Sequence, residues 1–338
     1  VPAQAPLLRP LDDLFDAADL ADFDPAALER CRWEGRLYAL PRAVETRLLF
    51  YRSDLFDERR EQQWFHEASG GRDLRVPRAW DELAAVAQYF TRAGKMYGFL
   101  FPGRGPGLVA TFAEIMTTVG GTFFDPEGQP RFYSRAGEWT LTLLRDLYRR
   151  WEAVPPETPQ CGYEDVSEAF RMGRCALACD FPATARLLCD PTFSAVAGWH
   201  SVALYPAGPQ GHRAVWTGCS AFAIPAACER TEPAVAALRF LVSRESQLLE
   251  AKDGAIPTRL SALEAERDRL RPGTLGHLRF TLAEQTLRMA RLTAPRLPQY
   301  REIEERLWPL LQQAVEGHME PAEALQAALR AAEDALSA

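Results

Sequence analysis

The stretch that decides the fold is GRLYALPRAVETRLLFYRSDLF, which runs from Gly35 to Phe56. Within it, residues Arg36 to Ala43 predict an extended segment that Pro41 breaks, because proline cannot donate to a sheet ladder. Residues Arg47 to Ser53 form a short aromatic and apolar run, which predicts a buried strand. The stretch therefore predicts two extended segments in close succession.

Strands and helices alternate along the rest of the chain. Apolar residues at helical spacing predict a helix from Ala79 to Gly94, and a strand from Met96 to Phe101 follows it. The glycines and prolines of PGRGPGL, directly after that strand, predict an irregular loop. Helices are also predicted over residues 300–315 and from Pro321 to the end. This alternation is typical of an α/β architecture.

The composition is that of an ordinary globular protein. The chain has 338 residues, of which 47% are hydrophobic and 25% charged, and this length predicts two domains or lobes. The net charge of −7 argues against a nucleic-acid partner, since such proteins usually carry a basic patch. We find no apolar run long enough to cross a bilayer and no signal peptide, as expected for a mature or trimmed form of an exported protein.

The seven cysteines do not form the paired CxxC motifs of a structural zinc site. The first interpretation for most of them is buried apolar packing, and an odd number leaves at least one thiol outside any intramolecular disulfide. A disulfide between Cys179 and Cys189 is the pairing we would test first. The sequence therefore indicates no metal and no cofactor.

No catalytic centre is recognisable. The five histidines are scattered, no GxSxG or Walker motif occurs, and the glycine spacing of GRGPG does not fit a dinucleotide site. A glycosidase would need two carboxylates a few ångströms apart across a cleft, and the sequence leaves that alternative open. We expect a binding protein and not an enzyme.

Six short motifs, taken in their order, carry a resemblance. They are the opening stretch, VPRAWDEL (76–83), VGGTFFDPEGQPRF (119–132), EAFRMGRCAL (168–177), WTGCSAFAIP (216–225) and GAIPTR (254–259). Together they resemble the extracellular, or periplasmic, solute-binding proteins of ABC sugar importers, sugar-type family 1. The resemblance implies an α/β, two-lobed, periplasmic-binding-protein-like (type II) fold whose hinge the chain crosses three times.

The resemblance also implies a division of the chain. Crossings are expected near residues 43–46, 216–220 and 254–257. Lobe one would hold residues 1–43 and 218–256, and lobe two would hold residues 44–217 and 257–338. Family members begin with strand–helix units before the segment that matches PLLRPLDDLFD, and at ~30 residues per unit about two of them are expected to be missing here. Lobe one is therefore expected to be incomplete.

The first two expected crossings supply most of the candidate ligand-binding residues. The family places a ligand-facing residue at Glu45, whose carboxylate can accept two sugar hydroxyls; the alternative is a salt bridge with Arg42 or Arg47. Trp216 is either a stacking platform for a sugar ring or a core aromatic. The second crossing comprises Trp216, Thr217, Gly218 and Cys219. A second glycine is frequent in the family where this chain has cysteine, which puts close main-chain contact with a ligand in doubt.

Further candidates come from other motifs. The family usually has an aromatic that enters the cleft after the CALAC strand, which points to Phe181 with Asp180 beside it. Phe101 and Arg104 fall on the predicted glycine-rich loop, at the expected rim of the cleft. Tyr300 fits a position where the N-terminus of a helix points at the ligand.

The resemblance implies a receptor that captures a carbohydrate, a sugar or polyol, in an interlobe cleft and delivers it to the permease of an ABC importer. It is expected to act as a monomer, without a cofactor and without a nucleic-acid partner. Its expected place is the periplasm or the outside of the cell, where a lipoprotein anchor could attach it to the membrane. The alternative is a degenerate binding-protein-like sensor or interaction protein without a transport role. The sequence leaves both functions open.

Overall fold

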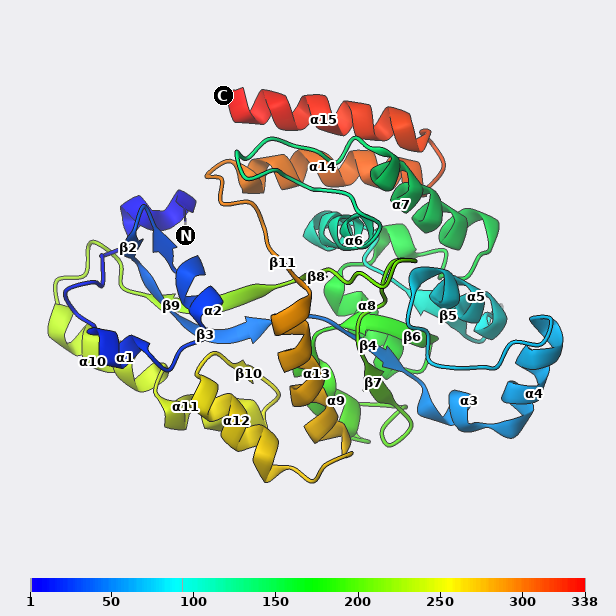
Figure 1. Cartoon of the computed structure of the whole chain (residues 1–338), viewed down its shortest axis with the longest axis horizontal. Helices are drawn as coiled ribbons and strands as arrows, with labels where there is room; N and C mark the ends of the chain where they lie inside the picture. The colour runs from blue at the N-terminus through cyan, green and yellow to red at the C-terminus, as the bar shows by residue number, and fades with distance from the viewer. Residues whose placement is uncertain (1, 93, 338) are drawn as a thin grey trace.

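The computed structural model describes residues 2–92 and 94–337 of the chain. Its strands form one sheet of three strands and one of four, with two short two-stranded pairs beside them. Each larger sheet carries its own helices, and the two resulting bodies lie side by side (Figure 1). The arrangement confirms the α/β architecture predicted from the alternation of strands and helices.

The three-stranded sheet has the order β10-β3-β9, and both of its strand pairs are antiparallel. Its strands are β3 (Ala39–Glu45), β9 (Gly218–Ala223) and β10 (Ile256–Pro257). Strand β3 runs through Pro41, so the predicted break at this proline is wrong. Its register with β9 shifts between Pro41 and Ala43 instead. An irregularity of this kind accommodates a residue without an N–H, so the strand continues.

Short elements and helices surround this sheet to form the three-stranded body (Figure 1). They are η1 (Pro2–Leu7), α1 (Ala17–Leu20), α2 (Pro25–Arg30), β1 (Arg32–Trp33), β2 (Arg36–Leu37), α10 (Thr231–Leu241), α11 (Arg244–Lys252) and α12 (Leu260–Arg269). Buried side chains from both ends of this set, such as Phe23, Leu40 and Leu238, share one apolar core. Two segments far apart in the sequence thus build one body.

The four-stranded sheet has the order β5-β6-β4-β7, with β5 parallel to β6 and the other pairs antiparallel. Its strands are β4 (Leu48–Tyr51), β5 (Tyr97–Leu100), β6 (Cys175–Asp180) and β7 (Ser201–Ala203). Around it lie α3 (Ser53–Asp57), α4 (Arg59–Ala68), α5 (Trp80–Phe90), α8 (Tyr163–Arg171), α9 (Ala185–Cys189) and α13 (Leu275–Met289). Every residue of β6 is buried, as in a strand covered on both faces.

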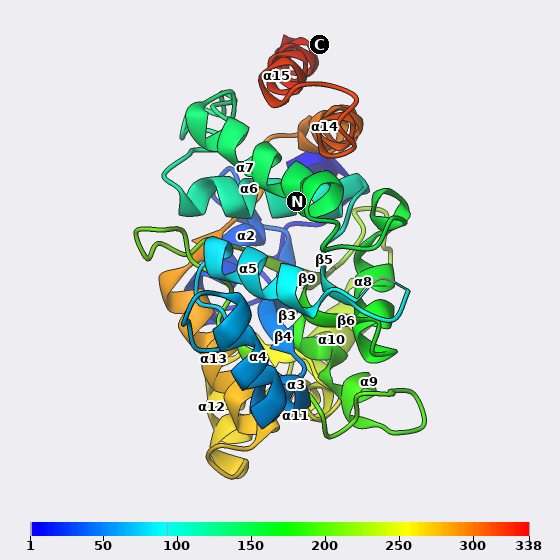
Figure 2. The same cartoon turned by 90° about the vertical axis from the view of Figure 1, so that its right-hand side faces the viewer.

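A helical layer completes the second body. It consists of α6 (Gly105–Thr118), α7 (Arg135–Arg145), α14 (Tyr300–Val315) and α15 (Pro321–Ser337), and Figure 2 shows α14 and α15 above α6 and α7. Short helical turns, η2 (Asp146–Arg150), η3 (Thr158–Gln160) and η4 (Pro182–Thr184), connect these elements. Among the described residues, no helix combines the length and apolar character that a membrane span needs.

Two sequence predictions fail in the second body. The predicted loop PGRGPGL becomes helical at Gly105, because Pro106 occupies the first turn of α6, where its missing N–H has no helical partner to lose. The helix predicted to reach Gly94 ends at Phe90, since the backbone of Thr91 is extended. The first change leaves Phe101 and Arg104 at the entry to a helix and not on a long loop.

The two bodies meet where β3 passes into β4, with only Thr46 and Arg47 between the strands. Strand β8 (Val215–Trp216) returns the chain to β9 beside this junction, and β11 (Arg291–Leu292) pairs with β8 in parallel. Figure 1 shows β3 and β9 extending from the three-stranded body toward the other body. This junction positions the candidate site.

Candidate functional site

Glu45 and Gly218 face each other across the junction. They are paired residues in the β3–β9 register, at the last position of one strand and the first of the other. The Glu45 side chain is exposed. A Cβ atom placed on Gly218 would lie 3.3 Å from Glu45 Oε2, which is a crowded contact. Glycine at position 218 therefore leaves space beside the carboxylate of Glu45.

Four partly exposed aromatic residues surround the junction. Trp216 and Tyr300 stack with 6.3 Å between their ring centroids and an interplanar angle of 28°. Phe181 packs edge-on against Tyr163 at 5.2 Å between centroids. Partly exposed rings offer faces on which the C–H surface of a sugar or polyol can pack.

Two carboxylates accompany these rings. Glu304 lies one helical turn after Tyr300 in α14, and the Tyr300 hydroxyl donates a hydrogen bond of 3.2 Å to it. Burial raises the pKa of Glu304, against the effect of that hydrogen bond. Glu45 is exposed as a residue, but its carboxyl group is partly desolvated, which raises its pKa. Burial is the largest cause of the raised pKa of Tyr163, and the charges of Glu304 and Glu45 contribute to it. We call Glu45, Tyr163, Phe181, Trp216, Gly218, Tyr300 and Glu304 the junction cluster.

Glu45 has no ion-pair partner among the described residues. Arg42 pairs instead with Glu250 at 2.9 Å, and Arg47 pairs with Glu114 at 3.0 Å. The alternative considered from the sequence, a salt bridge from Glu45 to Arg42 or Arg47, is therefore not formed. The exposed carboxylate keeps its acceptor positions open for other donors.

A buried ion pair between Arg47 and Glu114 contacts the junction cluster. Arg47 and Glu114 have side chains that are 1% and 0% exposed. Glu114 accepts hydrogen bonds from the Tyr205 hydroxyl at 2.6 Å and from the backbone N–H of Trp216 at 2.7 Å. Burial, the largest single effect, acts to lower the pKa of Arg47, but Glu114 together with Tyr163, Tyr205 and Cys179 raises it overall, so Arg47 stays charged. The pair thereby holds both chain crossings together.

Arg47 also orients Tyr163. Its Nη2 atom donates to the Tyr163 hydroxyl oxygen at 3.3 Å, and its guanidinium carbon lies 5.1 Å from the centre of the Tyr163 ring. Because the hydroxyl oxygen accepts this bond, its own proton is available to a further acceptor. Arg47 therefore acts as a positioning residue for a ring and a donor of the junction cluster.

Asp180 lies at the end of β6 and is only 3% exposed. It accepts hydrogen bonds from the Ser167 hydroxyl at 2.6 Å and from the backbone N–H of Phe181 at 2.7 Å. Burial raises its pKa to about 6, although these hydrogen bonds oppose the rise. Its contacts fix the backbone at Phe181, which belongs to the junction cluster.

The structure leaves five predicted site residues outside the junction cluster, namely Asp180, described above, and four others. Phe101 is 1% exposed and packs in the core against Phe99, since the strand before it continues inward. Arg104 is exposed and lies 3.8 Å from a carboxylate oxygen of Asp165. Thr217 is buried, with its hydroxyl bonded to the carbonyl of Val215 at 3.0 Å. The fourth residue, Cys219, directs its sulfur at the carbonyl oxygen of Ala27 in α2.

Sequence reasoning missed Tyr163, Glu304 and Glu114. Glu304 follows Tyr300 by four residues, so helical spacing alone places the two on one face. Glu114 is the only charged residue of α6, whose other side chains are apolar or small, and a lone carboxylate there signals a buried partner. Tyr163 has no comparable signal, because its place depends on how α8 packs.

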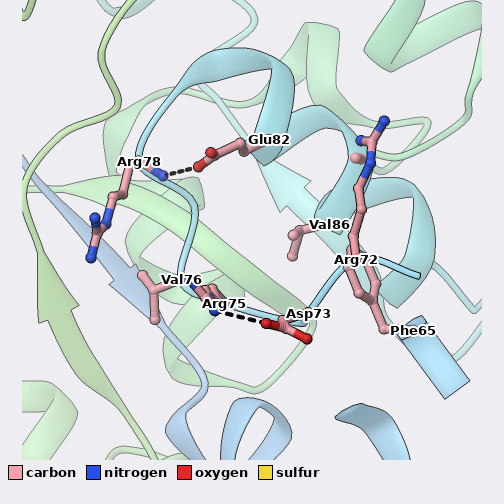
Figure 3. Close-up of a pocket in the computed structure, with 9 residues that line it drawn as sticks. Phe65, Arg72, Asp73, Arg75, Val76, Arg78, Glu82 and Val86 are labelled. Atoms are coloured by element: carbon pink, nitrogen blue, oxygen red, sulfur yellow. Dashed lines mark hydrogen bonds and ion pairs between the residues drawn. The ribbon is translucent and has the colours of Figure 1, made fainter. Parts of the chain in front are cut away.

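The cavity drawn in Figure 3, of about 410 Å³, lies elsewhere, between the segment after α4 and helix α5. Its walls include Arg75, which pairs with Asp73 at 2.7 Å, and the backbone N–H of Arg78, which donates to Glu82. Its one aromatic residue, Phe65, is buried in the core. Several of its polar groups pair with each other, and no exposed aromatic ring lines it. Sugar recognition is therefore better supported at the junction cluster.

The described residues show neither a metal-ligand group nor a disulfide. In the described ranges, no three His, Cys, Asp or Glu side chains gather as a metal site would require. All seven cysteines are free, with Cys179 buried in β6 and Cys189 exposed on α9, so the expected disulfide between these two is not formed.

Comparisons with known proteins place the chain in a family. Residues 3–248 match the family described as bacterial extracellular solute-binding protein. A mannitol-binding protein of Pseudomonas aeruginosa is 27% identical over 68% of this chain and 50% of its own length. A Deinococcus radiodurans protein named as a probable ABC transporter-binding protein is 25% identical over 78% of this chain and 61% of its own. The chain thus spans half to three fifths of the length of these curated relatives.

Solved structures show the same fold. Maltose-bound MalE3 of T. maritima superposes with a TM-score of 0.84 at 26% identity, covering 98% of this chain and 82% of the other. A solute-binding protein of Agrobacterium radiobacter in complex with ribitol superposes with a TM-score of 0.80 at 25% identity, covering 98% and 83%. With the family match over most of its length and the two-lobed fold of these structures, the chain belongs to the bacterial extracellular solute-binding proteins.

Proposed function

We propose that this chain captures a sugar or polyol at the junction cluster and delivers it to the permease of an ABC importer. The observation that carries the proposal is an exposed carboxylate without an ion-pair partner, Glu45, beside partly exposed rings at the meeting point of two bodies. Relatives named for mannitol, and solved relatives bound to maltose and ribitol, support a polyhydroxylated ligand. As a member of a binding-protein family, the chain would work outside the cytoplasm, without cofactor or catalysis.

The proposed recognition follows from the side chains. The stacked rings of Trp216 and Tyr300 would cover the apolar face of the ligand. Glu45 and Glu304 would accept hydroxyl protons, and the hydroxyl of Tyr163 would donate. Each ligand hydroxyl buried without a partner costs about 1–3 kcal/mol, so this combination favours ligands with several hydroxyls over apolar ones.

The proposed lobes correspond to the two bodies. We assign residues 1–43 and 218–256 to lobe one, and residues 44–217 and 257–338 to lobe two. This division gives α12 to lobe two, although α12 packs on α11 of lobe one. Near the last crossing the two lobes are therefore joined by helix packing as well as by the backbone. Rotation about the three crossings would close the lobes on a ligand, and the permease would recognise the closed form. A lipid anchor stays a prediction of the resemblance.

A thermal-shift screen tests the proposal. Mannitol, ribitol, maltose and glucose are added to the chain, with an amino acid as the negative control. A ligand that binds only the folded state, at a hundred times its dissociation constant, stabilises it by about 2.7 kcal/mol. We expect at least one polyol or sugar to raise the melting temperature; a flat response to the whole panel would favour the sensor or interaction function instead.

Glu45→Gln is expected to weaken binding of the screened ligand about 10- to 100-fold, because a hydrogen bond to a charged acceptor contributes about 1.5–3 kcal/mol. Titration calorimetry on the folded variant measures this change. Glu229→Gln makes the same change at an exposed position outside the junction cluster and should leave the affinity unchanged. Equal affinities for the wild type and Glu45→Gln would exclude Glu45 from the site.

A further inference from the structure

Two cysteines far apart in the sequence, Cys31 and Cys219, both pack in the three-stranded body. Cys31 is the residue at which α2 ends, and it is 1% exposed. Cys219 is the second residue of β9 and is partly exposed. Cys31 belongs to the apolar core of this body, and Cys219 packs against that core.

The contacts place both thiols in one region of this core. The Cys219 thiol lies 3.8 Å from the carbonyl oxygen of Ala27, in the last turn of α2. Cys31 follows that turn directly, and its backbone N–H donates to the carbonyl of Leu28 at 3.0 Å. The interaction between the two thiols is also the largest cause of the raised pKa of Cys31 and of the lowered pKa of Cys219.

We propose that Cys31 and Cys219 are a disulfide-forming pair that links the end of α2 to strand β9 when the protein meets an oxidising compartment. The extracytoplasmic location rests on the proposed function. The oxidant is a disulfide, either a thiol–disulfide oxidoreductase or glutathione disulfide. Disulfides persist in oxidising compartments, and this one would join segments that the fold already holds in contact.

The reaction proceeds by two exchanges. The Cys219 thiolate, on the more exposed of the two residues, attacks one sulfur of glutathione disulfide and displaces one glutathione thiolate. The Cys31 thiolate then attacks the Cys219 sulfur of the mixed disulfide and displaces the second glutathione. Both protein thiol protons end on the two glutathione molecules, so two protein thiols are oxidised while one glutathione disulfide is reduced.

Four of the other five cysteines are placed less favourably. Cys175 is 0% exposed inside the four-stranded sheet, out of reach of an external disulfide. Cys161 directs its thiol to the carbonyl of Glu157 at 3.3 Å. Cys179 is buried and Cys189 is exposed. Cys31, directly after α2, and Cys219, in β9, pack in one core, and the partly exposed Cys219 gives access to an oxidant.

The test is alkylation and mass measurement on the full chain. The protein is equilibrated with excess glutathione disulfide, then denatured and alkylated without reductant. We expect at most five alkylated cysteines, because Cys31 and Cys219 are oxidised to each other and accessible thiols such as Cys189 can also carry glutathione, together with a proteolytic fragment that joins the peptides of Cys31 and Cys219. Cys31→Ser should abolish this fragment and leave glutathione on Cys219, whereas Cys189→Ser should leave the fragment in place.

Two outcomes overturn the proposal: seven alkylated cysteines after the oxidation, or a cross-linked fragment that contains another pair. The peptide map of the wild-type protein is decisive even where Cys31→Ser fails to fold. Ligand binding is not part of the measurement, so failure of the disulfide leaves the proposed sugar binding standing.

Discussion

Arg47→Met is expected to lower the free energy of unfolding by about 3–5 kcal/mol, because it leaves the carboxylate of Glu114 buried without its cation. Glu114 is 0% exposed, so it cannot recover hydration without opening the core. The loss is measured by urea unfolding at neutral pH. Arg75→Met removes an arginine from an exposed ion pair of 2.7 Å and should change stability by no more than about 0.5 kcal/mol.

The double variant Arg47→Met, Glu114→Gln distinguishes a buried charge from a simple loss of packing. Glutamine keeps an oxygen that can accept from the Trp216 N–H but carries no charge to desolvate. The double variant should therefore lose less stability than the sum of the single variants, with a coupling of about 1–3 kcal/mol. Strict additivity, or a single-variant loss below about 0.5 kcal/mol, would show that the ion pair does not stabilise the junction.

Asp180→Asn is expected to change how stability depends on pH. The pKa of Asp180 rises from the ordinary value of 3.8 to about 6 in the folded protein, chiefly through burial. A carboxyl whose pKa rises on folding contributes its full stability below the unfolded pKa and loses that contribution as the pH rises through the folded value. At 1.36 kcal/mol per unit, the loss from pH 4 to pH 7 is about 3 kcal/mol.

Asparagine at position 180 stays neutral, so the variant does not suffer this loss. The stability of Asp180→Asn minus that of the wild type should therefore rise by about 3 kcal/mol between pH 4 and pH 7. Urea unfolding of both proteins at the two pH values measures it, and any constant effect of the lost hydrogen bonds cancels in the difference. A difference that does not change with pH would mean that Asp180 titrates as an exposed carboxyl does.

The junction was the most predictable part of the molecule. The motif around Glu45 and the WTG motif each carry a local signal, and the β3–β9 register brings them together. Pro41 shows the limit of a local rule, since the strand passes through it with a shift of register. The glycine-rich segment before α6 shows another, because proline is as compatible with the first turn of a helix as with a loop.

Whether a side chain is buried was harder to predict than which part of the molecule it belongs to. Phe101 and Asp180 follow strands as expected, yet both are buried, because burial depends on which helices cover the strand ends. Tyr163 and Glu304 reach the junction from two helices whose orientation is fixed by packing. The three partners of Glu114 come from three segments, and no local pattern encodes that set.

A crystal structure of the chain grown with mannitol or maltose tests the central claim most directly. The proposed function requires the ligand at the junction cluster, against Trp216 and Tyr300 and with a hydroxyl bonded to Glu45. Ligand bound in the cavity beside α5, or at any position without contact to these three residues, would contradict it.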